Sequence, residues 1–136
     1  SFSSLIQTHG PYNAFAAVLY VISTAVAMGL VPVDVSPSNV GWNGTTVQIL
    51  DAGNWHLAQG PALLPNSRRL RSFWHAARQH GVAAPLQLVI DQCGRDVGRL
   101  RAALRGQLSA TGLVDPPDCL ASPRLRPPDR VIFRGW

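Results

Sequence analysis

Two aspartates and an asparagine are spaced along the first half of the chain in a way that suits metal chemistry. Asn39 follows Asp34 by five residues, and Asp51 follows Asn39 by twelve. Carboxylate and amide oxygens are the hard ligands that Mg²⁺ takes in proteins. A second carboxylate close to such a metal suits a general base or a group that orients a substrate hydroxyl. The pattern therefore predicts that Asn39 and Asp51 hold magnesium and that Asp34 is catalytic.

A short hairpin is needed to bring Asn39 and Asp51 together. Asn43-Gly44 is the strongest short turn signal, and it predicts strands over residues 39–42 and 46–50. Because a hairpin folds back on itself, its first and last residues lie side by side. Gly53 permits a sharp backbone path that turns the Asp51 carboxylate inward. Taken singly, each of these polar residues is also common in ordinary turns, so the prediction depends on their order and spacing together.

Helices are predicted on both sides of the hairpin. Apolar residues recur at three- and four-residue steps over residues 13–28, and Gly29 stands where that helix should stop. Further helices are predicted over residues 66–80, capped by Asn66 or Ser67, and over residues 95–108, with another apolar segment at residues 85–91. We therefore expect a mainly α domain over residues 1–113, with the loop and hairpin at 31–55. Residues 114–136 form a tail rich in proline and arginine, expected to lie over the surface.

Composition limits the chemistry that the chain can perform alone. Its 136 residues are 46% hydrophobic and 14% charged, which indicates one folded domain. All twelve basic residues are arginine, so no lysine is present for a Schiff base or for anchoring phosphate. The apolar run of residues 14–31 has the length of a membrane span, but it contains Tyr20, Ser23 and Thr24 and predicts a buried helix instead. Cys93 and Cys119 allow one disulfide at most and match no zinc spacing.

The order of these motifs resembles the catalytic segment of the protein-kinase-like fold, over about residues 13–55. That family pattern is an apolar helix, a loop with Asp and an Asn five residues on, a two-stranded hairpin and an Asp-x-Gly. On this resemblance Asp34 matches the catalytic-loop aspartate, Pro37 its common proline and Asn39 the magnesium-binding asparagine. Asp51 and Gly53 match the first and last residues of the Asp-Phe-Gly motif. Small divergent kinases, such as bacterial effector kinases or divergent secretory-pathway kinases, look similar.

The resemblance implies a C-terminal lobe that works with ATP and Mg²⁺ and transfers the γ-phosphoryl group to a hydroxyl of a protein substrate. The chain departs from the pattern at Pro32-Val33, where His-Arg usually precedes the aspartate, and no Ala-Pro-Glu motif follows. The glycine-rich loop and lysine of the N-terminal lobe are also absent. We therefore expect that lobe to lie upstream of Ser1 or to be missing, and the 136 residues alone to be inactive.

Two other functions remain open. The first is a pseudokinase or arginine-rich docking module that binds an acidic protein, with nucleic acid as the weaker candidate. Its contacts would include Arg68, Arg69 and Arg71, although a solvated surface is the simpler interpretation of these residues. The second is a small-molecule phosphotransferase of the aminoglycoside type, whose first motif usually begins His-Gly-Asp. The lack of lysine is typical of a GC-rich genome, or alternatively of a secreted effector selected against ubiquitination in a host cytosol.

Overall fold

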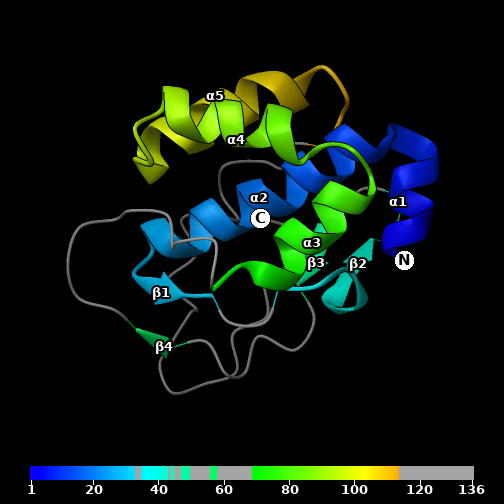
Figure 1. Cartoon of the computed structure of the whole chain (residues 1–136), viewed down its shortest axis with the longest axis horizontal. Coiled ribbons are helices and arrows are strands. Elements are labelled where there is room, and N and C mark those ends of the chain that lie inside the picture. The colour runs from blue at the N-terminus through cyan, green and yellow to red at the C-terminus, as the bar shows by residue number, and fades with distance from the viewer. Residues whose placement is uncertain (33–34, 43, 45–46, 50–55, 58–68, 114–136) are drawn as a thin grey trace.

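The computed structural model describes residues 1–32, 35–42, 44, 47–49, 56–57 and 69–113 (Figure 1). This part of the chain is mainly helical, as predicted, with two antiparallel pairs of short strands. In chain order the elements are α1 (Phe2–His9), α2 (Pro11–Ala27), β1 (Leu30–Val31), the 3-10 helix η1 (Pro37–Asn39), β2 (Val40–Trp42), β3 (Val47–Ile49), β4 (His56–Leu57), α3 (Arg71–Gln79), α4 (Ala83–Gln92) and α5 (Val97–Ser109).

Helix α2 is the centre of the fold. All of its residues from Ala14 to Val26 are buried, including the polar Ser23 and Thr24, whose hydroxyls donate to the carbonyl oxygen of Tyr20. A proline fits its first turn because the backbone N–H groups there have no intrahelical acceptor, so the N–H that proline lacks is not missed. Gly29 ends it with a φ of +87°, a left-handed conformation that glycine adopts at little cost. The predicted helix over 13–28 is thus confirmed, with a start two residues earlier. In the described ranges, no helix is long and apolar enough to cross a membrane.

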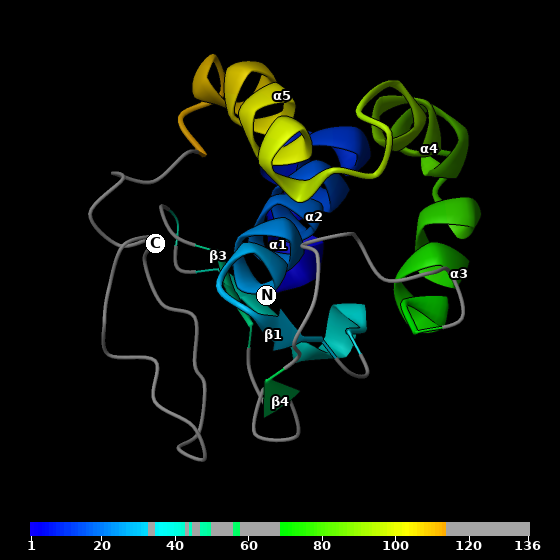
Figure 2. The same cartoon turned by 90° about the vertical axis from the view of Figure 1, so that its left-hand side faces the viewer.

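The other helices surround α2. Helix α1, which the sequence analysis did not predict, packs on α2 through an edge-to-face contact between Phe2 and Phe15, with ring centres 4.9 Å apart. Phe15 also meets Phe73 of α3 at 5.7 Å. Helix α5 runs along another side of α2, with α4 beside it, and the strands lie on the side of α2 away from α5 (Figure 2). A single hydrophobic core therefore joins all five helices and the hairpin strands.

Two helix boundaries differ from the prediction over 66–80 and 95–108. Helix α3 begins at Arg71, because residues 69–70 form a turn, while residues 66–68 lie outside the described part. Helix α5 begins at Val97 rather than Arg95, since Arg95 has a φ of +62° and cannot belong to a right-handed helix. The side chain of Asp96 caps α5 by accepting from the backbone N–H of Arg99 at 3.0 Å. The apolar segment at 85–91 lies within α4.

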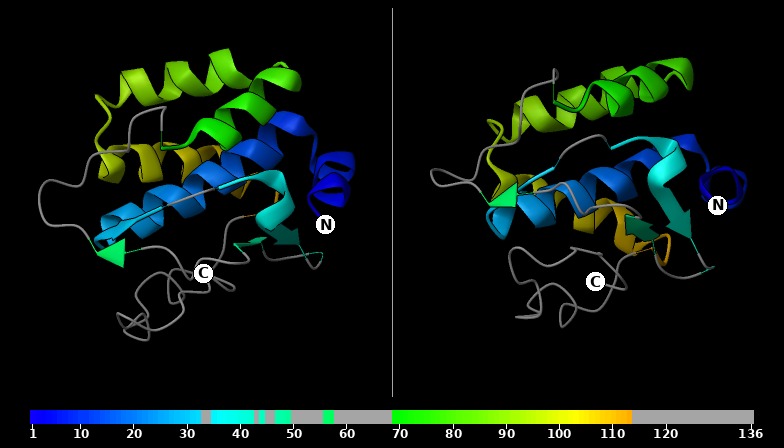
Figure 3. Two further views of the ribbon diagram at one scale, coloured as in Figure 1. Left: turned by 60° about the horizontal axis from the view of Figure 1, so that its bottom comes forward. Right: turned by 90° about the horizontal axis from the view of Figure 1, so that it is seen from below.

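The four strands form two pairs, and the pairs are nested in the sequence: the first strand pairs with the fourth and the second with the third. Strands β2 and β3 pair antiparallel in the register Val40 with Ile49 and Trp42 with Val47, which confirms the predicted hairpin. Strands β1 and β4 pair antiparallel as well, Leu30 with Leu57, and this pair was not predicted. Figure 3 shows β1 and β4 near one end of α2, and η1 with the hairpin near its other end, beside α1.

Candidate functional site

Asn39 lies at the base of the hairpin. It is the last residue of η1 rather than the first residue of a strand, because the turn that starts at Pro37 directs its backbone N–H to the carbonyl oxygen of Ser36, at 2.9 Å. The next residue, Val40, pairs with Ile49, and both side chains are buried. Asn39 itself is half-buried. The structure thus places the predicted metal-binding asparagine beside the strand that leads to Asp51, while Asp51 and Gly53 lie outside the described residues.

The predicted catalytic loop is anchored on both sides of residue 34. Pro32 and Val35 are both buried, and Asp34, between them, is outside the described residues. Pro37 is the first residue of η1, and the fixed φ of proline suits the first position of a helical turn. The hydroxyls of Ser36 and Ser38 share a hydrogen bond of 2.8 Å on the exposed side of this turn. Helix α3 packs against η1, the last part of this loop.

The nested strand pairs connect the two segments that carry the predicted aspartates. Residues 32–39 lead from β1 to β2, and residues 50–55 lead from β3 to β4. Because β1 pairs with β4 and β2 pairs with β3, these segments start and end at the same two places in the fold. The sequence predicted only the inner pair, at whose base Asn39 lies. The outer pair brings the residue before the first segment, Val31, beside the residue after the second, His56.

Of the predicted metal-site residues, only Asn39 lies within the described part of the chain. Asn39 offers an amide oxygen, and the aspartates on the two segments offer carboxylates, which is the ligand set that Mg²⁺ accepts alongside water. In the described ranges, no group of three or more His, Cys, Asp or Glu side chains could hold a metal. The thiol of Cys93 is free and buried. Cys119, in the tail, lies outside these ranges.

The predicted docking arginines are separated by the start of α3. Arg71 is the first residue of that helix, and Arg69 lies in the turn before it; both are exposed. Arg68 lies outside the described residues. Helix α3 itself packs against η1.

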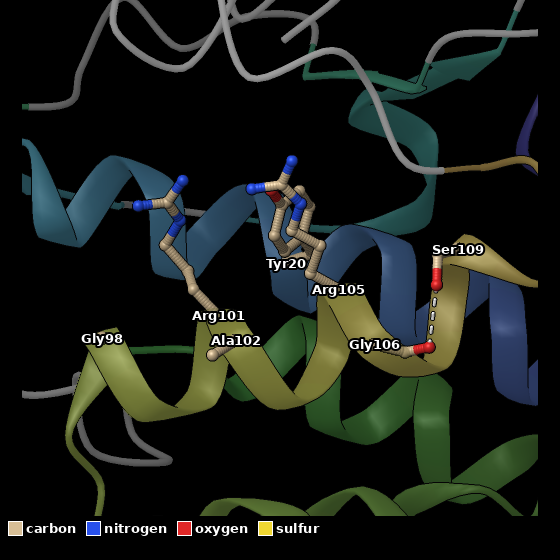
Figure 4. A pocket seen from close by; sticks show the side chains of 7 residues that line it. All are labelled: Tyr20, Gly98, Arg101, Ala102, Arg105, Gly106 and Ser109. Carbon is tan, nitrogen blue, oxygen red and sulfur yellow. Dashed lines mark hydrogen bonds between the residues drawn. The ribbon is translucent and has the colours of Figure 1, made fainter.

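The sequence analysis missed a second group of polar side chains, between α2 and α5. Tyr20 of α2 lies beside Arg101 and Arg105 of α5 around a hollow in the surface (Figure 4). One signal was available, since the two arginines are four residues apart and so share a helix face. Their pairing with Tyr20 depends on how α2 and α5 pack, which no local pattern reveals.

Comparison with known proteins identifies no family for the chain. No family model matches the chain, and no curated protein or solved structure matches it either. The functional proposals therefore rest on the residues and their placement.

Proposed function

We propose that the chain is the C-terminal lobe of a protein-kinase-like phosphotransferase that uses ATP and Mg²⁺ and is inactive without an N-terminal lobe. The observation that supports this most is the nesting of the strand pair β1–β4 around the hairpin β2–β3. In this arrangement Val31, just before the segment that carries Asp34, pairs with His56, just after the segment that carries Asp51. The arrangement follows directly after a buried helix, which is the order of the family pattern.

Each residue has a distinct role in this proposal. The amide oxygen of Asn39 and the carboxylate of Asp51 hold the magnesium ion, which neutralises charge on the ATP phosphates when it is bound. Asp34 accepts a hydrogen bond from the substrate hydroxyl, orients it toward the γ-phosphorus and takes up its proton. Pro37 fixes the turn between Asp34 and Asn39, and Gly53 allows the backbone bend after Asp51.

The metal site can be tested on the chain itself, without nucleotide. Mn²⁺ occupies oxygen-rich Mg²⁺ sites and broadens the NMR signals of nearby nuclei. On titrating Mn²⁺ into ¹⁵N-labelled protein, we expect the amide signals of Asn39, Val40 and Ile49 to broaden first. The substitution Asp51→Asn should abolish this selectivity and leave the dispersion of the spectrum unchanged, because asparagine has nearly the size and shape of aspartate and lacks only its charge.

A matched control is available on α4. Asp91 is an exposed carboxylate that accepts from Gln87 at 3.0 Å. Asp91→Asn removes the same charge and should leave the broadening near Asn39 intact. Broadening that is centred on Asp91 or Asp96, or that survives Asp51→Asn, would show that the metal assignment is wrong. In a complete protein with its N-terminal lobe, Asp51→Asn should also remove Mg²⁺-dependent ATP binding.

The charge of the helical surface favours a second function, a pseudokinase or docking module for an acidic protein. The described residues contain only two carboxylate side chains, Asp91 and Asp96, against seven arginines: Arg69, Arg71, Arg78, Arg95, Arg99, Arg101 and Arg105. Such a module would bind an acidic peptide with an affinity that falls steeply as salt is raised, and it would be indifferent to Mg²⁺ and ATP. The Mn²⁺ titration therefore separates this function from the first.

A further inference from the structure

A hollow of about 450 Å³ lies on the surface between α2 and α5. Tyr20 contributes one wall, and α5 contributes the rest (Figure 4). Gly98, Ala102 and Gly106 follow one another at four-residue steps on α5, so no long side chain fills the space above this stripe of the helix. Arg101 and Arg105 project from the same helix toward α2, on the side where Tyr20 lies.

Polar groups without partners are buried at this hollow. Tyr20 is 1% exposed, and its hydroxyl has no hydrogen-bond partner. The guanidinium of Arg101 lies over the Tyr20 ring, 5.8 Å from the ring centre, and its buried Nε–H is also unpartnered. Buried donors are almost always satisfied in folded proteins, because leaving one unpaired is destabilising. Two unpaired donors around one hollow therefore leave a place for acceptor atoms from outside the chain.

The charge of the hollow defines the matching ligand further. Within the described part of the chain, none of the lining residues is acidic, and neither Arg101 nor Arg105 forms an ion pair. The hydroxyl of Ser109 is already engaged, since it donates to the carbonyl oxygen of Gly106 at 3.0 Å. Two guanidinium groups and the Tyr20 O–H are left as donors. The site therefore suits an anion that only accepts hydrogen bonds.

We propose that this hollow binds a phosphate monoester. Two guanidinium forks and a hydroxyl offer more donors than the two oxygens of a carboxylate can accept, whereas a phosphate monoester presents three strongly accepting oxygens. Arginine matches phosphate in a bidentate manner, with two parallel N–H bonds. A volume of about 450 Å³ also leaves room for the organic group of the ester. This site does not depend on the proposed kinase function, because it uses none of the residues of that site.

Phenyl phosphate is a suitable probe of the full chain, measured by isothermal titration calorimetry at fixed ionic strength. Arg101→Gln and Arg105→Gln should each weaken its binding about tenfold, the effect of losing a charge-assisted hydrogen bond. Tyr20→Phe should weaken binding several-fold while leaving the melting temperature of the free protein unchanged or higher, because it deletes an unpaired buried hydroxyl. That combination distinguishes a ligand-binding hydroxyl from a structural one.

Arg99→Gln is the matched control, since Arg99 is exposed on the same helix and does not line the hollow. It removes the same charge and should change the affinity less than twofold. Inorganic phosphate should bind more weakly than phenyl phosphate, and benzoate more weakly than either. The proposal would be overturned by absence of phenyl phosphate binding, by equal binding of benzoate, or by equal losses in Arg99→Gln and Arg101→Gln.

Discussion

The hydroxyl of Tyr12 joins the first turn of α2 to the last turns of α5. It donates to the side-chain oxygen of Gln107 at 2.8 Å, across 95 residues of sequence. Partial burial of the Tyr12 side chain raises the pKa of its hydroxyl above the ordinary value of 10.0. The folded protein therefore keeps the hydroxyl neutral at a pH where the unfolded chain has begun to ionise.

This difference makes stability depend on pH in the alkaline range. Below pH 10.0 the tyrosine is neutral in both states and its contribution is fully present. As pH rises through 10.0 toward the higher folded pKa, the unfolded state releases its proton first, so the free energy of unfolding falls. In Tyr12→Phe this part of the decline should be missing. Urea denaturation at several values between about pH 9 and pH 11 checks it, and parallel declines in both proteins would contradict the assignment.

At the scale of the element, the stability of α5 depends on its N-cap. Asp96 accepts from the backbone N–H of Arg99, and its charge also faces the positive end of the helix dipole. We expect Asp96→Ala to lower the free energy of unfolding by about 1 kcal/mol, whereas Asp96→Asn should cost only a few tenths, because asparagine is an equally good cap. Chemical denaturation of the three proteins measures this. Equal losses in both variants would show that charge, not capping, is responsible.

Local patterns predicted some elements and missed others for identifiable reasons. Helix α2 was predicted from its apolar periodicity and the hairpin from Asn43-Gly44, because each of these signals lies within a short stretch of sequence. The pairing of β1 with β4 was missed because Leu30 and Leu57 are far apart in sequence and each strand has only two residues. The start of α5 was placed too early, since the left-handed conformation of Arg95 is fixed by the turn after α4.

The same limit applies to the two candidate sites. The position of Asn39 at the base of a hairpin was predictable because a hairpin is a local structure, but its place at the end of η1 was not. The hollow at Tyr20 was not, because it exists only where α2 and α5 pack together. In the sequence, Tyr20 has the pattern of a core residue of an apolar helix. Only the packed structure shows that Arg101 lies over its ring. Sites formed by distant segments therefore need the tertiary structure before their residues can be connected.

For the molecule as a whole, the described core is one continuous cluster that runs from Phe2 to Leu113. It contains the buried faces of all five helices and the hairpin valines and isoleucine, which is the set expected of a self-sufficient domain. We therefore predict that a chain ending at Leu113 folds without residues 114–136. Its far-ultraviolet circular dichroism should show the same helical content, and its urea unfolding should remain a single cooperative transition.

The amide spectrum gives the sharper form of this test. Signals of residues in α2 and α5 should keep their positions in the shortened chain, because these two helices pack on each other and both contribute buried residues to the cluster. A loss of cooperativity, or shifts spread over the whole spectrum, would show that the last 23 residues belong to the domain. The boundary at residue 113 would then be wrong, and the tail would have to be counted as part of the fold.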